Sequence, residues 1–521
     1  TTGYVYDKRG RLKEINHQGT RFRISRDDAG RIHSMVVVGD EEDGPSLRTD
    51  YDVFGQVSSI SSTEGQTTGK RFFTAIRDES GRVLTQTVFN EDPWNLEYDA
   101  KGWLSRATRI DSESHDSVLE EIRYERDASG NITRRTDNGS GMAMTVNHLN
   151  QLVSRGVPQD IEVNGVADRA AIVTVNRQPT DRQGPLFRAN VPVETSDQPA
   201  WQVIDVVAVV PEAGPNLEDA VSTNRAHRFV PQTPEIFEYD AAGRLTRDGR
   251  WDYGWDAEDR LISMRTREDV FHAIADPGFP MTDLEFAYDS LNRRVRKIVC
   301  TQSTLEDDWT TQSDTGFVYD GWKLIAELDL LAGSKPIRSY AWGIDLSGSL
   351  SGAHGVGGLV AIHDHATGTT TLPCADGNGN VVGLIDTANG EMVARYDYEP
   401  YGKLLRISGQ SARANPIRFS SRYQDSETGL VYFGRRYYSP ETGRWLSRDP
   451  LGEDAGPNLY AYADNDPINR IDPIGEDVYV VTRPLNMDLL NKAAPAAVHI
   501  FLAFDNKGIS DQATWAAEVQ H

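Results

Sequence analysis

The feature that most constrains this chain is a short pattern that recurs along most of its length. Each copy has an aromatic residue or Arg, then Asp, then a polar turn that often ends in Gly, then Arg or a substitute and an aliphatic residue. The clear copies begin at Tyr6-Asp7, Arg26-Asp27, Tyr51-Asp52, Arg77-Asp78, Tyr98-Asp99, Arg126-Asp127, Tyr239-Asp240, Trp255-Asp256, Tyr288-Asp289 and Tyr319-Asp320. A chain built this way is a repeat array, so the number of globular domains cannot be estimated from its length of 521 residues.

Each repeat predicts a β-hairpin. Asp followed three residues later by Gly is turn chemistry, because the carboxylate accepts hydrogen bonds from nearby backbone N–H groups and Gly adopts positive φ. The flanks alternate in polarity, as in residues 21–25, which is the period of a half-buried strand. A lone hairpin cannot bury its apolar face, whereas many side by side form one continuous sheet. We therefore expect the repeat Tyr and Asp residues to build a wall rather than to catalyse.

Composition excludes some classes of protein. Lys and Arg total 54 against 78 Asp and Glu, a formal net charge of -24, which argues against nucleic-acid binding because that function needs a basic surface. No long apolar run predicts a membrane-spanning helix. Two cysteines, Cys300 and Cys374, cannot form a disulfide framework. The chain opens within a repeat and without Met, so we expect a fragment or processed piece, whose missing signal peptide says nothing about destination.

The repeats are interrupted at residues 155–230. This stretch loses the Tyr-Asp pattern and gains Val and Pro, and its apolar segments at 163–165, 171–176, 186–191 and 203–210 predict short strands. Several strands at this spacing suggest a small β-sandwich. We favour a spacer over a carbohydrate- or protein-binding role for it.

The most specific motifs lie between residues 419 and 475. They are Phe419-Ser420-Ser421-Arg422-Tyr423, the run from Glu427 to Tyr438 (ETGLVYFGRRYY), the run from Glu441 to Pro450 (ETGRWLSRDP), Asn458-Leu459-Tyr460-Ala461-Tyr462, Asn465-Asp466-Pro467 and Asp472-Pro473-Ile474-Gly475. Together with the repeats, this order resembles the YD-repeat family of Rhs proteins and toxin-complex C components, with its Rhs-associated core domain.

The resemblance implies an all-β fold. In that family the repeats wind as a β-hairpin spiral into a hollow shell, or cocoon, around the C-terminal part of the same chain, sometimes with an immunoglobulin-like insert. The expected organisation is repeats at 1–154, an immunoglobulin-like insert at 155–230, repeats at 231–410, a core-associated plug at 411–475 and a variable C-terminal segment at 476–521.

The resemblance also implies a chemistry for the plug. The family's core domain is an aspartyl autoprotease that cuts the chain after its terminal Asp-Pro-x-Gly motif. By motif, Asp449 and Asp472 would be the catalytic carboxylates and Arg448 a supporting residue that sets charge and orientation. Two carboxylates held close cannot both ionise, so one keeps a proton as general acid while the other activates water. Asp464 and Asp466 are further acidic candidates of lower weight.

Two features of the sequence count against active self-cleavage and leave both outcomes open. Asp-Pro is ordinary turn chemistry, and the chain also has it at Asp92-Pro93 and Asp276-Pro277, far from the plug. The family often has Leu or Met after the Gly, where this chain has Glu476, which would bring a third negative charge to the pair.

No cofactor or metal is expected. His363 and His365 lie on one face of a predicted strand near Cys374, but no third ligand at a known spacing supports a metal site, and a polar cluster is the favoured interpretation. The glycines at 355–358 lack the Lys-Ser/Thr ending of a phosphate-binding loop and indicate a bent segment of the shell.

The favoured function is a secreted or cell-surface shell that encloses and delivers a variable C-terminal effector and releases it by self-cleavage. The implied partners are the chain's own effector segment, secretion-apparatus or toxin-complex components, an immunity protein and cell-surface glycans. The alternative is a surface or wall-associated protein that binds carbohydrate or neighbouring cells and cuts nothing. In the tail, strands are predicted at 478–481 and 498–504, a helix at 511–519, and His499 is a candidate toxin base; the tail would be a truncated effector or a remnant.

Overall fold

A computed structural model describes residues 1–480, except 40–41, 54, 63–68, 90, 113–116, 215–217, 277 and 477. The predicted strand at 498–504, the helix at 511–519 and His499 lie outside the described residues. Within them the regular structure is mostly β-sheet, with one short α-helix, α1 (Glu268–Ile274), and short 3-10 helices between residues 419 and 465. No helix among these residues has the length and apolar character to cross a membrane.

The first long sheet contains fifteen strands, hydrogen-bonded to one another in chain order and antiparallel. They are β1 (Thr2–Tyr6), β2 (Leu12–His17), β3 (Thr20–Arg26), β4 (Ile32–Val38), β5 (Ser46–Tyr51), β6 (Val57–Ser62), β7 (Arg71–Arg77), β8 (Val83–Val88), β9 (Trp94–Tyr98), β10 (Leu104–Ile110), β11 (Val118–Arg126), β12 (Ile132–Asp137), β13 (Ser140–Val146), β14 (Leu152–Arg155) and β22 (Glu235–Ile236).

A second long sheet of fourteen strands continues the chain in the same way, with α1 between its fourth and fifth strands. Its strands are β23 (Glu238–Tyr239), β24 (Leu245–Arg247), β25 (Trp251–Trp255), β26 (Leu261–Thr266), β27 (Met281–Tyr288), β28 (Arg294–Gln302), β29 (Thr310–Asp320), β30 (Lys323–Asp329), β31 (Lys335–Trp342), β32 (Leu359–Asp364), β33 (Thr370–Ala375), β34 (Val381–Asp386), β35 (Met392–Tyr398) and β36 (Leu404–Ser408). These two sheets confirm the predicted repeat hairpins.

The Asp-Gly turns have the predicted chemistry. In the first copy, Asp7 Oδ1 accepts hydrogen bonds from the backbone N–H groups of Arg9 and Arg11, and Asp7 Oδ2 accepts one from Arg11 Nε. Gly10 has φ +73, the left-handed region that a side chain would disfavour. The same Asp-to-Arg contact spans four residues at Asp27, Asp78, Asp240, Asp256 and Asp289.

In most repeats the residue before the Asp connects that repeat to the preceding one. The Tyr98 hydroxyl donates to the carbonyl oxygen of Val83 at 2.8 Å, and Arg77 Nη1 donates to the carbonyl oxygen of Val57 at 2.9 Å. The same contact recurs at Tyr51 with Ile32, Arg126 with Leu104, Trp255 with Leu245 and Tyr288 with Leu261. Tyr, Trp and Arg therefore interchange at this position because each carries a hydrogen-bond donor at the end of a long side chain.

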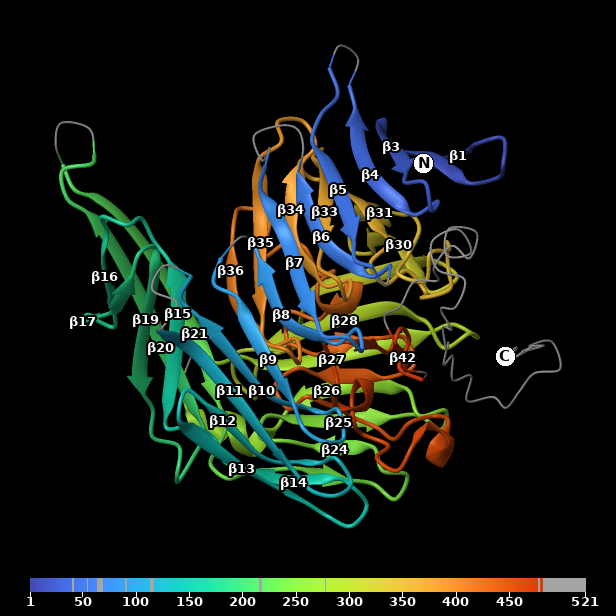
Figure 1. Cartoon of the computed structure of the whole chain (residues 1–521). Helices are drawn as coiled ribbons and strands as arrows, with labels where there is room; N and C mark the ends of the chain where they lie inside the picture. Colours follow the sequence, from blue (N-terminus) through green and yellow to red (C-terminus); the bar gives the residue numbers. More distant parts are fainter. Residues whose placement is uncertain are drawn as a thin grey trace.

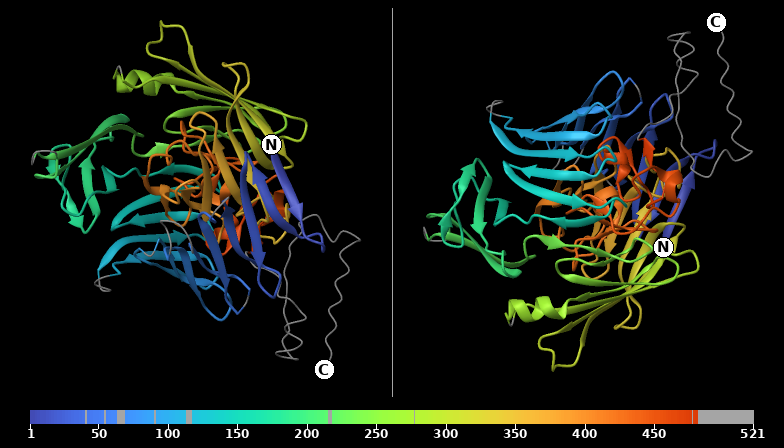
Figure 2. Two further views of the ribbon diagram at one scale, coloured as in Figure 1. Left: turned by 90° about the horizontal axis from the view of Figure 1, so that it is seen from above. Right: turned by 90° about the horizontal axis from the view of Figure 1, so that it is seen from below.

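The two long sheets face each other (Figure 1). At one end they pack directly, since Ile15 and Phe22 of the first sheet share an apolar core with Val360 and Leu372 of the second. Elsewhere the segment at 411–475 lies between them, and Figure 2 shows it, coloured orange to red, between the blue-to-cyan and the green-to-yellow strands. The arrangement is mostly β with long antiparallel sheets, as predicted; closure into a complete spiral shell stays a prediction.

The interruption forms two small sheets beside the long ones (Figure 1). One contains β15 (Asp160–Val166), β19 (Leu186–Pro192) and β18 (Asp181–Gln183); the other contains β17 (Gln178–Pro179), β16 (Ile172–Val175), β20 (Ala200–Val210) and β21 (Ala220–Val230). They share an apolar core that includes Ile161, Val173, Phe187 and Ile204. The immunoglobulin-like assignment and the domain boundaries stay predictions.

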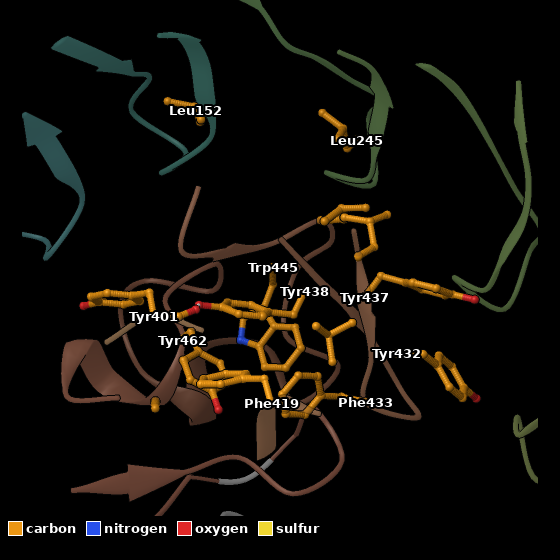
Figure 3. Packing of buried hydrophobic residues seen from close by; sticks show 14 of the residues in the cluster. Leu152, Leu245, Tyr401, Phe419, Tyr432, Phe433, Tyr437, Tyr438, Trp445 and Tyr462 are labelled. Atoms are coloured by element: carbon orange, nitrogen blue, oxygen red, sulfur yellow. The ribbon is translucent and has the colours of Figure 1, made fainter. Parts of the chain in front are cut away.

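The segment between the sheets has little regular structure and is held by aromatic packing. Its strands are β37 (Tyr423–Gln424), β38 (Val431–Tyr432), β39 (Tyr437–Ser439), β40 (Arg444–Trp445) and β41 (Arg470–Ile471), the last pairing with β42 (Tyr479–Val480). Figure 3 shows the packing, in which Tyr438 and Tyr462 have ring centroids 4.4 Å apart and Phe433 and Trp445 have theirs 5.0 Å apart. This buried cluster positions the adjacent turn at 433–436.

Candidate functional site

The candidate site is built around Arg436, which directly precedes β39. Arg436 is only 2% exposed to solvent, and its guanidinium lies over the Trp445 ring, 4.2 Å from the ring centroid. The turn that carries it contacts the end of the plug, because the backbone N–H of Arg435 donates to the carbonyl oxygen of Ile474 at 2.9 Å. The aromatic cluster therefore places a buried cation against the Asp472-Pro473-Ile474-Gly475 motif.

Arg436 brings the two predicted carboxylates together. Its Nη2 atom lies 2.6 Å from Asp449 Oδ2 and 3.2 Å from Asp472 Oδ2. Asp449 follows β40 and Asp472 follows β41, so the two acids come from separate strands. The sequence-based expectation of a close pair at these positions agrees with this geometry; their catalytic role stays a prediction.

Asp472 is fully buried and its environment favours the protonated form. Burial raises the pKa of Asp472 to about 7; the guanidinium of Arg436 lowers it, and the neighbouring charge of Asp449 raises it further. Its Oδ1 atom accepts hydrogen bonds from the backbone N–H groups of Gly475 at 2.7 Å and of Glu476 at 3.0 Å. The carboxyl group thus lies against the peptide bond that follows the motif.

Asp449 is the less enclosed member of the pair. Burial also raises the pKa of Asp449, while Arg436 lowers it and the charge of Glu476 raises it slightly. Asp449 lines a cavity of about 300 Å³ together with Arg436, Arg448 and Glu476. The cavity is large enough for several water molecules, and Asp472 is not among the residues that line it.

The bond between Gly475 and Glu476 is contacted at both of its polar atoms. Arg436 Nε donates to the carbonyl oxygen of Gly475 at 2.6 Å, and the N–H of Glu476 donates to Asp472. Gly475 has φ +84, and an added Cβ would come within 3.2 Å of the Arg436 backbone nitrogen, so this close approach requires glycine. The Glu476 carboxylate turns to Arg435, with Oε1 3.1 Å from Nε.

The structure does not bring Arg448 to the carboxylates. Its side chain lies beside Gly243, where an added Cβ would come within 2.3 Å of Arg448 Nε, and it has no ion pair with Asp449 or Asp472 within the described residues. Arg436 takes the bridging position instead. No pattern in the sequence singles it out, although it lies in the Glu427–Tyr438 motif, because only the fold shows which arginine turns inward.

The other acidic candidates lie elsewhere. Asp464 pairs with Arg470 at the surface, and Asp466 accepts a hydrogen bond from Asn469 Nδ2 at 2.8 Å. Neither has a contact with Arg436 in the part of the chain that the structure describes.

His363 in β32 and His365, which directly follows that strand, form a polar cluster. His363 Nδ1 lies 2.9 Å from Thr370 Oγ1, and His365 Nε2 lies 3.1 Å from Ser339 Oγ. Cys374 is buried, and both cysteines are free. Among the described residues no group of three His, Cys, Asp or Glu side chains is arranged to hold a metal ion.

Several known proteins are similar to this chain. A family model described as Teneurin YD-shell matches residues 357–468. The tRNA3(Ser)-specific nuclease WapA of Bacillus spizizenii is 29% identical over 265 residues, which cover 50% of this chain and 10% of the relative. The double-stranded DNA deaminase toxin A of Burkholderia cenocepacia is 24% identical over 575 aligned residues, covering 91% of this chain and 38% of the relative.

Among solved structures, the crystal structure of TcdB2-TccC3-Cdc42 is similar with a TM-score of 0.37 and 17% identity, covering 91% of this chain and 25% of that chain. The chain therefore spans well under half the length of each of these proteins.

Proposed function

Because the chain belongs to the Rhs/YD-repeat shell family, we propose that it forms part of a shell that encloses and delivers a C-terminal effector, and that its plug cuts the chain after Gly475. The nuclease and deaminase toxins to which it is similar support the first part. The second part rests on one observation: the Gly475–Glu476 peptide bond has its oxygen on Arg436 and its nitrogen on Asp472.

The arrangement supports hydrolysis by an unequal pair of carboxylic acids. Asp449, which lines the cavity, would take a proton from a water molecule as the water oxygen bonds to the carbonyl carbon of Gly475. Arg436 Nε would stabilise the negative charge that develops on the carbonyl oxygen. Asp472 would give its proton to the nitrogen of Glu476 as the carbon–nitrogen bond breaks, leaving a new carboxylate at Gly475 and a new amine at Glu476.

The pKa values support the same division of roles. A carboxyl group with a pKa of about 7 keeps a proton near neutral pH, as an acid catalyst requires, and this describes Asp472. Asp449 has the shorter contact to Arg436 and is the better candidate for the ionised partner. Glu476, whose charge counted against cleavage in the sequence, is ion-paired with Arg435, and this pairing offsets the third negative charge.

A denaturing gel with mass spectrometry tests the proposal. The wild-type chain should yield a fragment that ends at Gly475, whereas Asp449→Asn and Asp472→Asn should stay intact. Asp464→Asn is the matched control, because this surface aspartate should leave the cut unchanged. An intact wild-type chain, or equal cutting in all four proteins, would overturn self-cleavage and leave the surface-binding alternative to be tested with polysaccharides.

A further inference from the structure

We propose that a cavity at the junction of the insert, the second long sheet and the plug is a binding site for a small carboxylate that carries a flat aromatic ring. The cavity has a volume of about 600 Å³, within the range of small-molecule sites. Trp201 and Phe229 line it from the insert, Arg250 and Trp251 from the second sheet, and Glu441 from the plug. We call it the junction cavity; it is separate from the candidate cleavage site and goes beyond the proposed function.

The observation that carries the proposal is the state of Arg250. Its guanidinium lies 4.5 Å from the ring centroid of Trp251, 5.3 Å from that of Phe229 and 5.4 Å from that of Phe279. Its side chain has no hydrogen bond or ion pair within the described residues, and its Nε is buried without a partner. Burial lowers the pKa of Arg250 to about 10, which reflects the cost of holding the charge there.

The neighbouring acid does not satisfy this guanidinium. Asp248 Oδ1 accepts hydrogen bonds from the backbone N–H groups of Arg250 and Trp251, and Asp248 Oδ2 accepts one from the Tyr253 hydroxyl at 2.5 Å. Asp248 therefore acts on the Arg250 charge only through space. A carboxylate from outside the chain would supply the two acceptors that an arginine fork binds best.

Three other cations that line the junction cavity already have partners. Arg155 pairs with Glu235, and Lys403 lies 3.4 Å from Glu441. Arg444 donates to Asn131 Oδ1 at 3.1 Å. Unlike Arg155 and Lys403, Arg250 has no ion pair among the described residues, so an incoming anion would bind there without breaking one.

We infer an aromatic ring on the ligand because aromatic side chains line the cavity. Trp201 stacks on His227 with ring centroids 5.3 Å apart, and it also packs against Phe279 at 5.1 Å. Phe229 and Trp251, which also line the cavity, have ring centroids 5.3 and 4.5 Å from the Arg250 guanidinium, so a flat apolar body attached to the carboxylate would contact aromatic faces. A bound ligand would also join the insert to the sheet, since it would touch both.

Isothermal titration calorimetry on the full chain, with benzoate as the probe, tests the proposal. Benzoate should bind saturably, whereas benzyl alcohol, a neutral molecule of similar size, should bind at least ten times more weakly. Arg250→Met should lose benzoate binding, and Arg250→Lys should weaken it about tenfold or more because Lys lacks the fork. Arg225→Met is the matched control, because Arg225 pairs with Asp205 on the same insert.

The free variant gives a second readout that a structural role would not produce. Because Arg250→Met removes a partly buried charge that has no ion pair among the described residues, its melting temperature without ligand should equal or exceed that of the wild type. A clearly lower melting temperature would identify Arg250 as a structural cation and overturn the proposal. The proposal would also be overturned if Arg250→Met still bound benzoate saturably, or if the wild type bound no benzoate. Asp472→Asn should still bind benzoate, so a failure of this binding proposal can be distinguished from a failure of the self-cleavage proposal.

Discussion

Arg436 donates from its Nε atom to the carbonyl oxygen of Gly475 at 2.6 Å. The same guanidinium contacts Asp449 and Asp472 through Nη2. One side chain thus joins both candidate catalytic acids to the bond that they would cut. The rigid fork of arginine makes this possible, because its donors point in fixed and different directions.

Replacing Arg436 with Lys should abolish self-cleavage and destabilise the plug. A single ammonium group cannot make the contacts to Gly475 and to both carboxylates at once, and disrupting a buried charge network of this kind typically costs about 3–5 kcal/mol. A denaturing gel measures the first effect and urea unfolding the second. Arg470→Lys, whose partner Asp464 is exposed, should change the free energy of unfolding by less than ~1 kcal/mol. Wild-type cleavage in Arg436→Lys would contradict the role given to this residue.

Asp472 should make the protein less stable as the pH rises from about 4 to 7. Burial raises the pKa of Asp472 to about 7, so over this window the folded protein keeps a proton that the unfolded chain releases. The loss amounts to up to about 4 kcal/mol in the free energy of unfolding. Urea unfolding at several pH values should show a smaller decline in Asp472→Asn; equal pH profiles for the two proteins would rule out this titration.

His17 should act in the opposite direction. Burial lowers the pKa of His17 to about 4, and the charges of His363 and His365 add to the effect. The unfolded chain takes up a proton below about pH 6.5 that the folded protein excludes, so stability falls as the pH drops from about 6.5 to 4. His17→Gln should reduce this acid sensitivity in thermal melts. The exposed His148→Gln serves as the control and should behave like the wild type.

A repeat variant with Glu in place of Asp begins at Tyr398-Glu399, and Tyr398 makes the contact that links successive repeats. Its hydroxyl donates to the carbonyl oxygen of Val381 at 2.8 Å, so Tyr398→Phe should lower the free energy of unfolding by about 1–2 kcal/mol. Tyr6→Phe is the control, because the Tyr6 side chain is exposed and has no such contact within the described residues. Equal stability of the two variants would show that the contact contributes nothing.

Short-range patterns in the sequence were enough to predict the hairpins that form the two long sheets. The contact between Asp7 and Arg11 spans four residues, so a pattern of that length reveals the turn wherever it recurs. The reason that Tyr and Arg interchange before the Asp was not visible, because the acceptor at Val83 lies fifteen residues before Tyr98. A contact at that separation depends on how neighbouring hairpins pair.

The candidate site also has one part that sequence motifs pointed to and another part that only the fold reveals. The motifs identified Asp449 and Asp472, and the fold places them on one guanidinium. No short-range pattern distinguishes Arg436 from Arg448, because the choice depends on which arginine turns toward Trp445 and the buried acids. The unpartnered Nε of Arg250 is likewise a property of its surroundings, since folding buries that atom without giving it a hydrogen-bond acceptor among the described residues. The sequence by itself determined the repeated hairpins, and the family resemblance pointed to the two acids. The tertiary structure decided which cation meets them, because those contacts join separate segments of the plug.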